Sequence, residues 1–145
     1  MLRFNTAGLF SDSAAWERYT VDAAGGYFLG VFDGRFVYFV PGWNGQAGAS
    51  GIHGEVLRFD TTGAFDDAGS WETFDAGYDK GYLGAVFDGT YVYFVPHDRG
   101  GDYFGEVLRY NTFGGFMDPS AWEAFDAGSG EGYSGGTFDG RYVYF

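Results

Sequence analysis

The stretch FDGRFVYFV at residues 32–40 decides the fold, because the chain repeats it as FDGTYVYFV at 87–95 and as FDGRYVYF at 138–145. The copies begin 55 and 51 residues apart. Self-similarity at a period of this size indicates a repeat architecture. The chain is therefore expected to be one domain over residues 1–145, with repeats at approximately 1–55, 56–106 and 107–145.

Further matches extend the repeat on both sides of this stretch. The equivalent positions are Leu2, Leu57 and Leu108; Arg3, Arg58 and Arg109; Phe10, Phe65 and Phe116; Asp12, Asp67 and Asp118; and Trp16, Trp71 and Trp122. Each Trp precedes the Phe of the next FDG by 16 residues. The difference in repeat length therefore falls after the VYFV stretch, which predicts a surface loop there.

Each repeat contains four short runs of strand composition, which we name a, b, c and d in chain order. In the middle copy they cover residues 82–87, 91–95, 106–110 and 122–125. The Asp-Gly pair between a and b predicts a two-residue type I′ hairpin, in which both central residues have positive φ. An Asp four residues before each Trp is expected to fix the c–d turn by accepting backbone N–H groups. The predicted fold class is all-β.

The order of these runs resembles the repeat of kelch-type β-propellers. A kelch repeat also has a strand c that ends in Tyr-Asp and a strand d that begins with Trp, which is similar to residues 107–111 followed by Trp122. Val-Pro follows strand b in this chain, where kelch repeats carry Gly-Gly. The resemblance covers the whole chain and implies a β-propeller of four-stranded antiparallel blades. It assigns no functional residues.

The arrangement of the repeats predicts how such a propeller closes. Two complete blades, at 27–74 and 82–125, lie between a c–d half-blade at 1–19 and an a–b half-blade at 133–145. Propellers typically have about four to eight blades, and an unpaired strand edge tends to pair with another chain. We therefore expect two chains, each with three blade equivalents, to form a six-bladed homodimer. The residues expected at the strand pairing between chains are Leu2, Phe4, Tyr142, Tyr144 and Phe145.

Composition and charge exclude several classes of protein. The 27 Gly and the 23% aromatic content are typical of many strands joined by tight turns. The net charge of −12 argues against a nucleic-acid partner, since phosphate binding depends on clustered Lys and Arg. Neither a long apolar segment nor a signal peptide is recognisable, so no membrane partner is expected. The absence of Cys excludes disulfides, and no cellular compartment is indicated.

Charged residues at repeated positions are expected to serve turns and packing, and the repeated Arg3, Arg58 and Arg109 are expected to pair with acids between blades. Residues that break the repeat are the better binding candidates, because loops on a rigid scaffold often carry function. Sequence drift in unconstrained loops, which we favour, gives the same pattern. The candidates in the b–c and d–a loops, which are expected to open on one face, are Trp43, His53, His97, Asp98, Arg99, Asp102, Tyr103, Asp79, Lys80 and Glu131.

Several catalytic signatures are present only superficially. Residues 132–136 read G-x-S-x-G, but a nucleophile elbow requires a strand, a sharp turn and a helix, and this string falls on strand a. Residues 67–71 are similar to the Asp-box of sialidase propellers and are interpreted as a structural turn. His53 and His97 occupy different repeat positions without partners at ligand spacing, and no calcium loop occurs. No catalytic residue, metal or cofactor is expected, and the chain is not expected to be an enzyme.

Three classes of function fit these observations. The first, which we favour, is a non-catalytic self-assembling scaffold, either complete or a fragment or engineered piece of a longer propeller. The second is a carbohydrate- or peptide-binding module that uses the loop aromatics Trp43 and Tyr103. The third is a propeller-type hydrolase or lyase, whose turnover would depend on Asp79 or Glu131. Binding to a glycan or peptide array would separate the second class from the first.

Overall fold

A computed structural model of the chain describes residues 1–46, 51–75, 81–98, 101–128 and 132–145. Its strands form two four-stranded sheets and two strand pairs, and every pairing is antiparallel. Among the described residues, none belongs to a helix with the length and apolar character needed to cross a bilayer. The all-β fold class is confirmed, and the four-stranded sheets are compatible with propeller blades.

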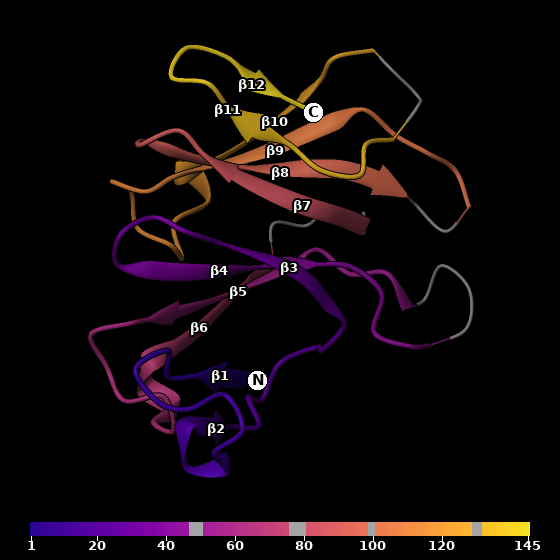
Figure 1. The fold of residues 1–145 in the computed structure, drawn as a ribbon. Helices are drawn as coiled ribbons and strands as arrows, with labels where there is room; N and C mark the ends of the chain where they lie inside the picture. Colours follow the sequence, from indigo (N-terminus) through magenta and orange to yellow (C-terminus); the bar gives the residue numbers. More distant parts are fainter. Residues whose placement is uncertain (47–50, 76–80, 99–100, 129–131) are drawn as a thin grey trace.

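The four units follow one another along the chain (Figure 1). The N-terminal pair consists of β1 (Leu2–Phe4) and β2 (Trp16–Arg18). Sheet I consists of β3 (Tyr27–Phe32), β4 (Phe36–Pro41), β5 (Glu55–Asp60) and β6 (Trp71–Asp75). Sheet II consists of β7 (Gly81–Phe87), β8 (Tyr91–Asp98), β9 (Glu106–Asn111) and β10 (Trp122–Asp126). The C-terminal pair consists of β11 (Thr137–Phe138) and β12 (Val143–Tyr144).

Within each sheet the strands pair in chain order, so β3 and β7 correspond to strand a and β6 and β10 to strand d. The N-terminal pair holds strands c and d of a unit, and the C-terminal pair holds strands a and b. In Figure 1 the two termini lie at opposite ends of the stack of units. In the four-stranded sheets strand b pairs with strand c, whereas β12 and β1, which are strands b and c of the terminal pairs, have no such neighbour among the described residues.

The a–b turns differ from the predicted type I′ hairpin. Gly34 has a φ of 106°, but no described residue other than glycine has a positive φ, so Asp33 does not adopt the conformation that type I′ requires. The reason is the Asp33 carboxylate, whose Oδ1 accepts the backbone N–H groups of Arg35 at 2.8 Å and Phe36 at 2.6 Å. Asp33 therefore precedes the turn and caps it. Gly89 and Gly140 have similar φ values, of 99° and 98°.

The c–d turns form as expected from their repeated Asp. Asp67 caps a short 3-10 turn at Ala68–Ser70 by accepting the N–H of Gly69 at 3.0 Å. Trp71 then donates its Nε1–H to the carbonyl of Phe65 at 2.9 Å. Both bonds recur in the other units, through Asp12 and Trp16 and through Asp118 and Trp122. Each turn therefore places a Phe beside the Trp of the same unit.

The main core lies between the two sheets. Tyr38 and Val40 of sheet I are fully buried against Tyr82 and Phe94 of sheet II. Full burial of such a side chain contributes about 1.5–3 kcal/mol to stability. A second cluster joins the N-terminal pair to sheet I around Phe65 and Trp71. Contacts between successive units therefore hold the fold together.

The repeated arginines pair with acids inside a unit, which corrects the prediction of pairs between blades. Arg58 and Glu72 lie directly opposite each other on β5 and β6, with Nη2 and Oε2 2.6 Å apart. The same cross-strand pairs recur as Arg3 with Glu17 and Arg109 with Glu123. Directly opposed residues on neighbouring strands are close enough to interact. The nearest carboxylate to each Arg is therefore the Glu opposite it in the same unit.

Candidate functional site

The b–c loops, and the d–a connections as far as they are described, lie at the same end of the antiparallel sheets, and we call this side the loop face. In Figure 1 the described parts of both b–c loops lie at the right of the view. Tyr133, on the d–a side, donates its backbone N–H to the carbonyl of Pro96 at 2.7 Å. Gly26 lies so close to Trp43 that an added Cβ would overlap the Trp43 backbone. Each b–c loop thus contacts a neighbouring d–a connection.

Two of the sequence candidates, Trp43 and His53, lie in the b–c loop of sheet I. Trp43 is half-exposed, and its Nε1–H donates to the carbonyl of Gln46 at 2.5 Å. The His53 ring meets the Tyr27 ring edge-on, with centroids 5.3 Å apart. Both His53 ring nitrogens are buried without a hydrogen-bond partner among the described residues. The repeat has Phe104 at this position, so His53 occupies a site of aromatic packing.

The b–c loop of sheet II holds a separate group of candidates. His97 Nδ1 lies 2.9 Å from the carbonyl oxygen of Tyr133, and the His97 ring meets that of Tyr103 edge-on at 5.4 Å. Asp98 accepts the N–H of Gly101 at 2.6 Å and forms an isolated bridge with Tyr103. Asp102 is exposed. These contacts brace the loop itself, and only Tyr103 presents a largely exposed ring.

Four candidates, Asp79, Lys80, Arg99 and Glu131, lie outside the described residues. Within the described ranges, no three His, Asp or Glu side chains gather closely enough to hold a metal ion. The described candidates form two groups, one in each b–c loop, and they are not brought together around a single cavity. The loop face therefore offers exposed rings and no convergent catalytic arrangement among the described residues.

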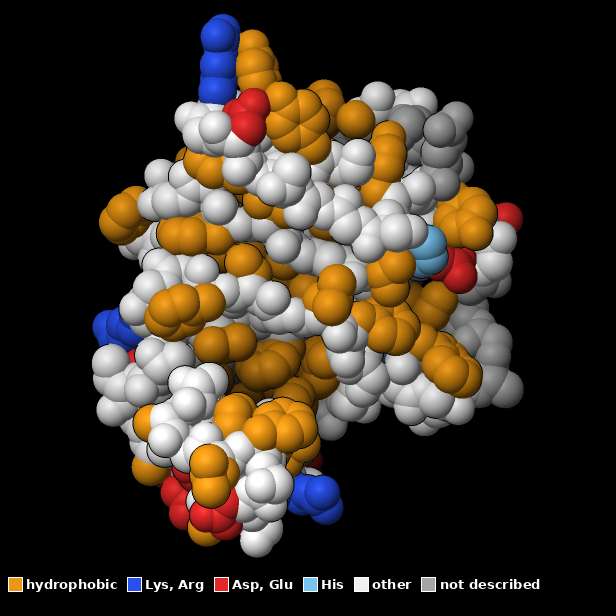
Figure 2. All heavy atoms as spheres, viewed as in Figure 1, with side chains coloured by type: hydrophobic (Ala, Val, Ile, Leu, Met, Phe, Trp, Pro, Cys, Tyr) orange, Lys and Arg blue, Asp and Glu red, His pale blue; other side chains and the backbone are white. Residues whose placement is uncertain are grey.

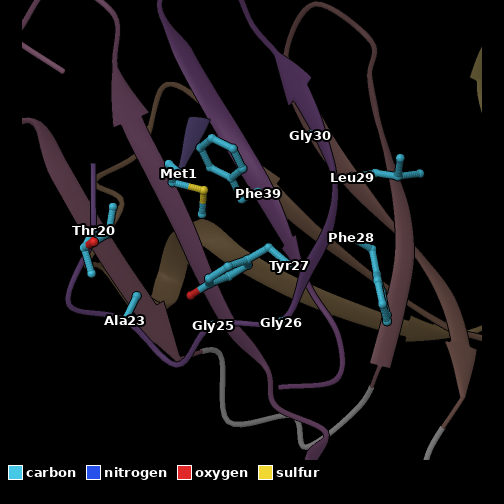
Figure 3. Close-up of a pocket in the computed structure, with 11 residues that line it drawn as sticks. Met1, Thr20, Ala23, Gly25, Gly26, Tyr27, Phe28, Leu29, Gly30 and Phe39 are labelled. Carbon is cyan, nitrogen blue, oxygen red and sulfur yellow. The ribbon is translucent and has the colours of Figure 1, made fainter. Parts of the chain in front are cut away.

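A cavity of about 610 Å³ lies between the N-terminal pair and the start of sheet I. Figure 3 shows Met1, Phe39 and Tyr27 around it, with Leu29 pointing away. Figure 2 shows apolar side chains along a recess in this part of the surface. Burial, the charge of Glu55 and a hydrogen bond to Glu55 raise the pKa of Tyr27 well above its ordinary value. The Tyr27 phenol therefore stays neutral at a cavity whose wall has both apolar and polar parts.

Residues of the terminal pairs are exposed where their repeat equivalents are buried. Leu2 is 57% exposed, whereas Leu57 and Leu108 are both 0% exposed. Tyr144 is 50% exposed, whereas of its equivalents Tyr38 is 0% exposed and Tyr93 is half-buried. The local chemistry is the same in each case, so the difference comes from missing neighbours. The terminal pairs are incomplete copies of the sheets.

A second cavity, of about 370 Å³, lies against β9 and β10, and Arg109, Glu123, Phe125 and Phe145 help to line it. Phe125 is 71% exposed. At the other end of the molecule, Phe10 is 74% exposed, although its equivalents Phe65 and Phe116 are 4% and 2% exposed. Sequence analysis missed Phe10 and Phe125 as candidates. The repeat alignment contains them, but their exposure becomes evident only when the units are placed in space.

No protein-family model matches the sequence, and no curated protein matches it significantly.

Proposed function

We propose that the chain is a non-catalytic, self-assembling β-propeller scaffold, in which two copies form a closed homodimer of six blades. Sheets I and II are complete blades. Two further blades form when the N-terminal pair of one chain supplies strands c and d to the a–b pair of the other. The single observation that carries this proposal is the exposure, at both terminal pairs, of residues that are buried in the complete sheets.

The two open edges are complementary in register. In sheet I, Val37 lies opposite Phe59 and Tyr38 opposite Arg58. Sheet II repeats this pairing between β8 and β9. The equivalent residues of β12 and β1 are Val143 with Phe4 and Tyr144 with Arg3. A chain that followed the same register would therefore pair its β12 with β1 of the partner.

The cavity beside the N-terminal pair fits the same arrangement. Tyr27, Phe39 and Met1 at this cavity are equivalent to Tyr82, Phe94 and Val56. In the complete interface those three residues belong to one buried cluster with Tyr38. The equivalent of Tyr38 is the exposed Tyr144. Tyr144 from a second chain would therefore fill the space that Tyr38 fills between sheets I and II.

An open strand edge with exposed apolar residues is avoided in folded proteins because it pairs with other chains. A twofold dimer removes both edges of each chain, since one contact generates the other. No further chain can then add to the ring. The proposed assembly is therefore closed and of defined size.

Light scattering of the 145-residue chain tests the proposal. The expected mass is about twice the chain mass of 15.9 kDa. Deletion of residues 141–145 should abolish assembly, because it removes β12. A chain that remains a folded monomer at high concentration, or a deletion variant that is still a folded dimer, would contradict the proposal.

A second candidate function is ligand binding on the loop face, favoured by the exposed rings of Trp43 and Tyr103. Aromatic rings on exposed loops offer stacking surfaces for sugar rings or for peptide side chains. A glycan and peptide array screen with the wild-type chain tests this candidate, and the variant Trp43→Ala with Tyr103→Ala should lose any signal. Failure of the variant to reduce binding would contradict it.

A further inference from the structure

An aromatic stacking contact joins the N-terminal pair to sheet I, and an equivalent contact joins sheet I to sheet II. Tyr19, which follows β2, stacks on Trp71 of sheet I with centroids 6.0 Å apart and an interplanar angle of 25°. Phe74 of sheet I stacks on Trp122 of sheet II at 4.8 Å and 17°. Tyr19 and Phe74 are equivalent residues, three positions after their own Trp. The contact is therefore part of the repeat.

A cation–π contact accompanies the stacking. The Arg3 guanidinium lies 4.4 Å from the ring centroid of Phe65 in the next unit. Arg58 lies 4.1 Å from the centroid of Phe116 in the next unit, and it also donates to the hydroxyl of Tyr110 at 3.3 Å. Attraction between a guanidinium and an aromatic face contributes about 0.5–2 kcal/mol, more as water is excluded. The interface between the N-terminal pair and sheet I and the interface between sheets I and II thus share two matched contacts.

The repeat contains a third set of residues equivalent to those in the two interfaces, and its members lie at opposite ends of the molecule. Sheet II offers Arg109 and Phe125, which are equivalent to Arg58 and Phe74 and which help to line the cavity of about 370 Å³. The N-terminal pair offers Phe10 and Trp16, which are equivalent to Phe116 and Trp122. Within the described part of one chain, Arg109 and Phe125 make no ring or cation–π contact with Phe10 or Trp16. Phe125 in sheet II and Phe10 in the N-terminal pair are exposed, whereas Arg109 and Trp16 are half-buried.

We infer that this cavity of sheet II is the binding site for Phe10 and Trp16 of a second copy of the chain, with Phe125 stacked on Trp16 and Arg109 over Phe10. This inference rests on the proposed dimer and adds a second contact surface to it. Strand pairing between β12 and β1 joins the edges, whereas this site joins the faces of adjacent blades. The aromatic contact would make binding selective for the N-terminal pair of a second copy, because another exposed strand would lack Phe10 and Trp16.

The test measures the dimer dissociation constant of Phe125→Ala by sedimentation or light scattering over a dilution series. Because Phe125 is 71% exposed within the chain, its truncation should leave sheet II folded, which circular dichroism checks. We expect the dissociation constant to rise by at least about tenfold, as for a central aromatic contact residue. Phe10→Ala should give a similar rise. The matched control is Phe113→Ala, which removes a ring that is 81% exposed in the c–d turn and has no part in the site.

The outcomes separate this inference from the proposed function. A wild-type chain that stays monomeric would overturn both. A wild-type dimer whose dissociation constant is changed by Phe125→Ala no more than by Phe113→Ala would overturn the aromatic site alone, and the strand exchange would stand. A selective loss of affinity in Phe125→Ala and Phe10→Ala, with the control unchanged, supports the site.

Discussion

The hydroxyl of Tyr38 donates a hydrogen bond to Oδ2 of Asp33 at 2.7 Å, from strand b back to the turn that precedes it. The same bond joins Tyr93 to Asp88 at 2.9 Å. Because Asp33 Oδ1 accepts backbone N–H groups of the turn, one carboxylate ties the turn to the strand. Burial, together with the hydrogen bond and charge of Asp33, raises the pKa of Tyr38 above its ordinary value.

Stability should therefore fall in alkaline solution. Tyr in an unfolded chain ionises at about pH 10, whereas folded Tyr38 stays neutral to a higher pH. Between these two pH values the unfolded state binds fewer protons than the folded state, so the free energy of unfolding decreases as the pH rises. Urea unfolding at a series of alkaline pH values measures the slope. Tyr38→Phe should have a shallower slope, and an equal slope in the variant would contradict this assignment.

Equivalent leucines should respond differently to truncation. Leu57→Ala should lower the free energy of unfolding by about 2–5 kcal/mol, because Leu57 is fully buried. Leu2→Ala should instead raise the dimer dissociation constant, because Leu2 would be buried only between chains. Urea unfolding and dilution experiments measure the two effects. A loss of stability in Leu2→Ala that does not depend on protein concentration would argue against the exchanged strand.

Engineered cysteines can test the register of the exchanged strands. The chain has no Cys, so Phe4→Cys with Val143→Cys introduces the only thiols. Opposed residues of antiparallel strands have Cα atoms about 4.5–5.5 Å apart, which suits a disulfide. Mild oxidation should give a covalent dimer on non-reducing gels. Phe4→Cys with Tyr144→Cys is the control, since adjacent side chains point to opposite faces; cross-linking there instead would show a shifted register.

The adjacent glycines Gly25 and Gly26 should differ in their tolerance of alanine. Both have positive φ, of 77° and 69°, so alanine at either position costs about 1–2 kcal/mol of backbone strain. An added Cβ on Gly25 meets nothing within 4 Å, whereas on Gly26 it overlaps the Trp43 backbone. Gly26→Ala should therefore lose about 1–3 kcal/mol more than Gly25→Ala in urea unfolding. Equal losses of stability would mean that the segment with Gly26 does not contact the b–c loop that holds Trp43.

The strands and the c–d turns could be predicted because each depends on a few residues close in sequence. Asp67 caps its turn through the N–H two residues later, and such a contact recurs wherever the local string recurs. The a–b turn was predicted wrongly because Asp-Gly alone does not show that the carboxylate caps the turn. The partner of Arg58 was also assigned wrongly, since strand register, which places Glu72 opposite it, is not visible in a single run of residues.

The candidate site was less predictable for a different physical reason. Trp43 and Tyr103 could be identified as exceptions to the repeat, but the contacts of Tyr103 with His97 depend on how one loop folds back on itself. Phe10 and Phe125 do not differ from the repeat in residue type, because their equivalents are also aromatic. Their exposure depends on which neighbour is absent, and only the arrangement of the units in space reveals it.

The stacking of Phe74 on Trp122 belongs to a chain of contacts that runs only from one unit to the next. Repeat proteins built in this way behave approximately as a one-dimensional series of coupled units. A unit at the end of such a series has one stabilising interface, whereas an interior unit has two. Closure into a ring would give every unit two interfaces, so amide protons of β1 and β12 should become as slow to exchange as those of β5 and β8.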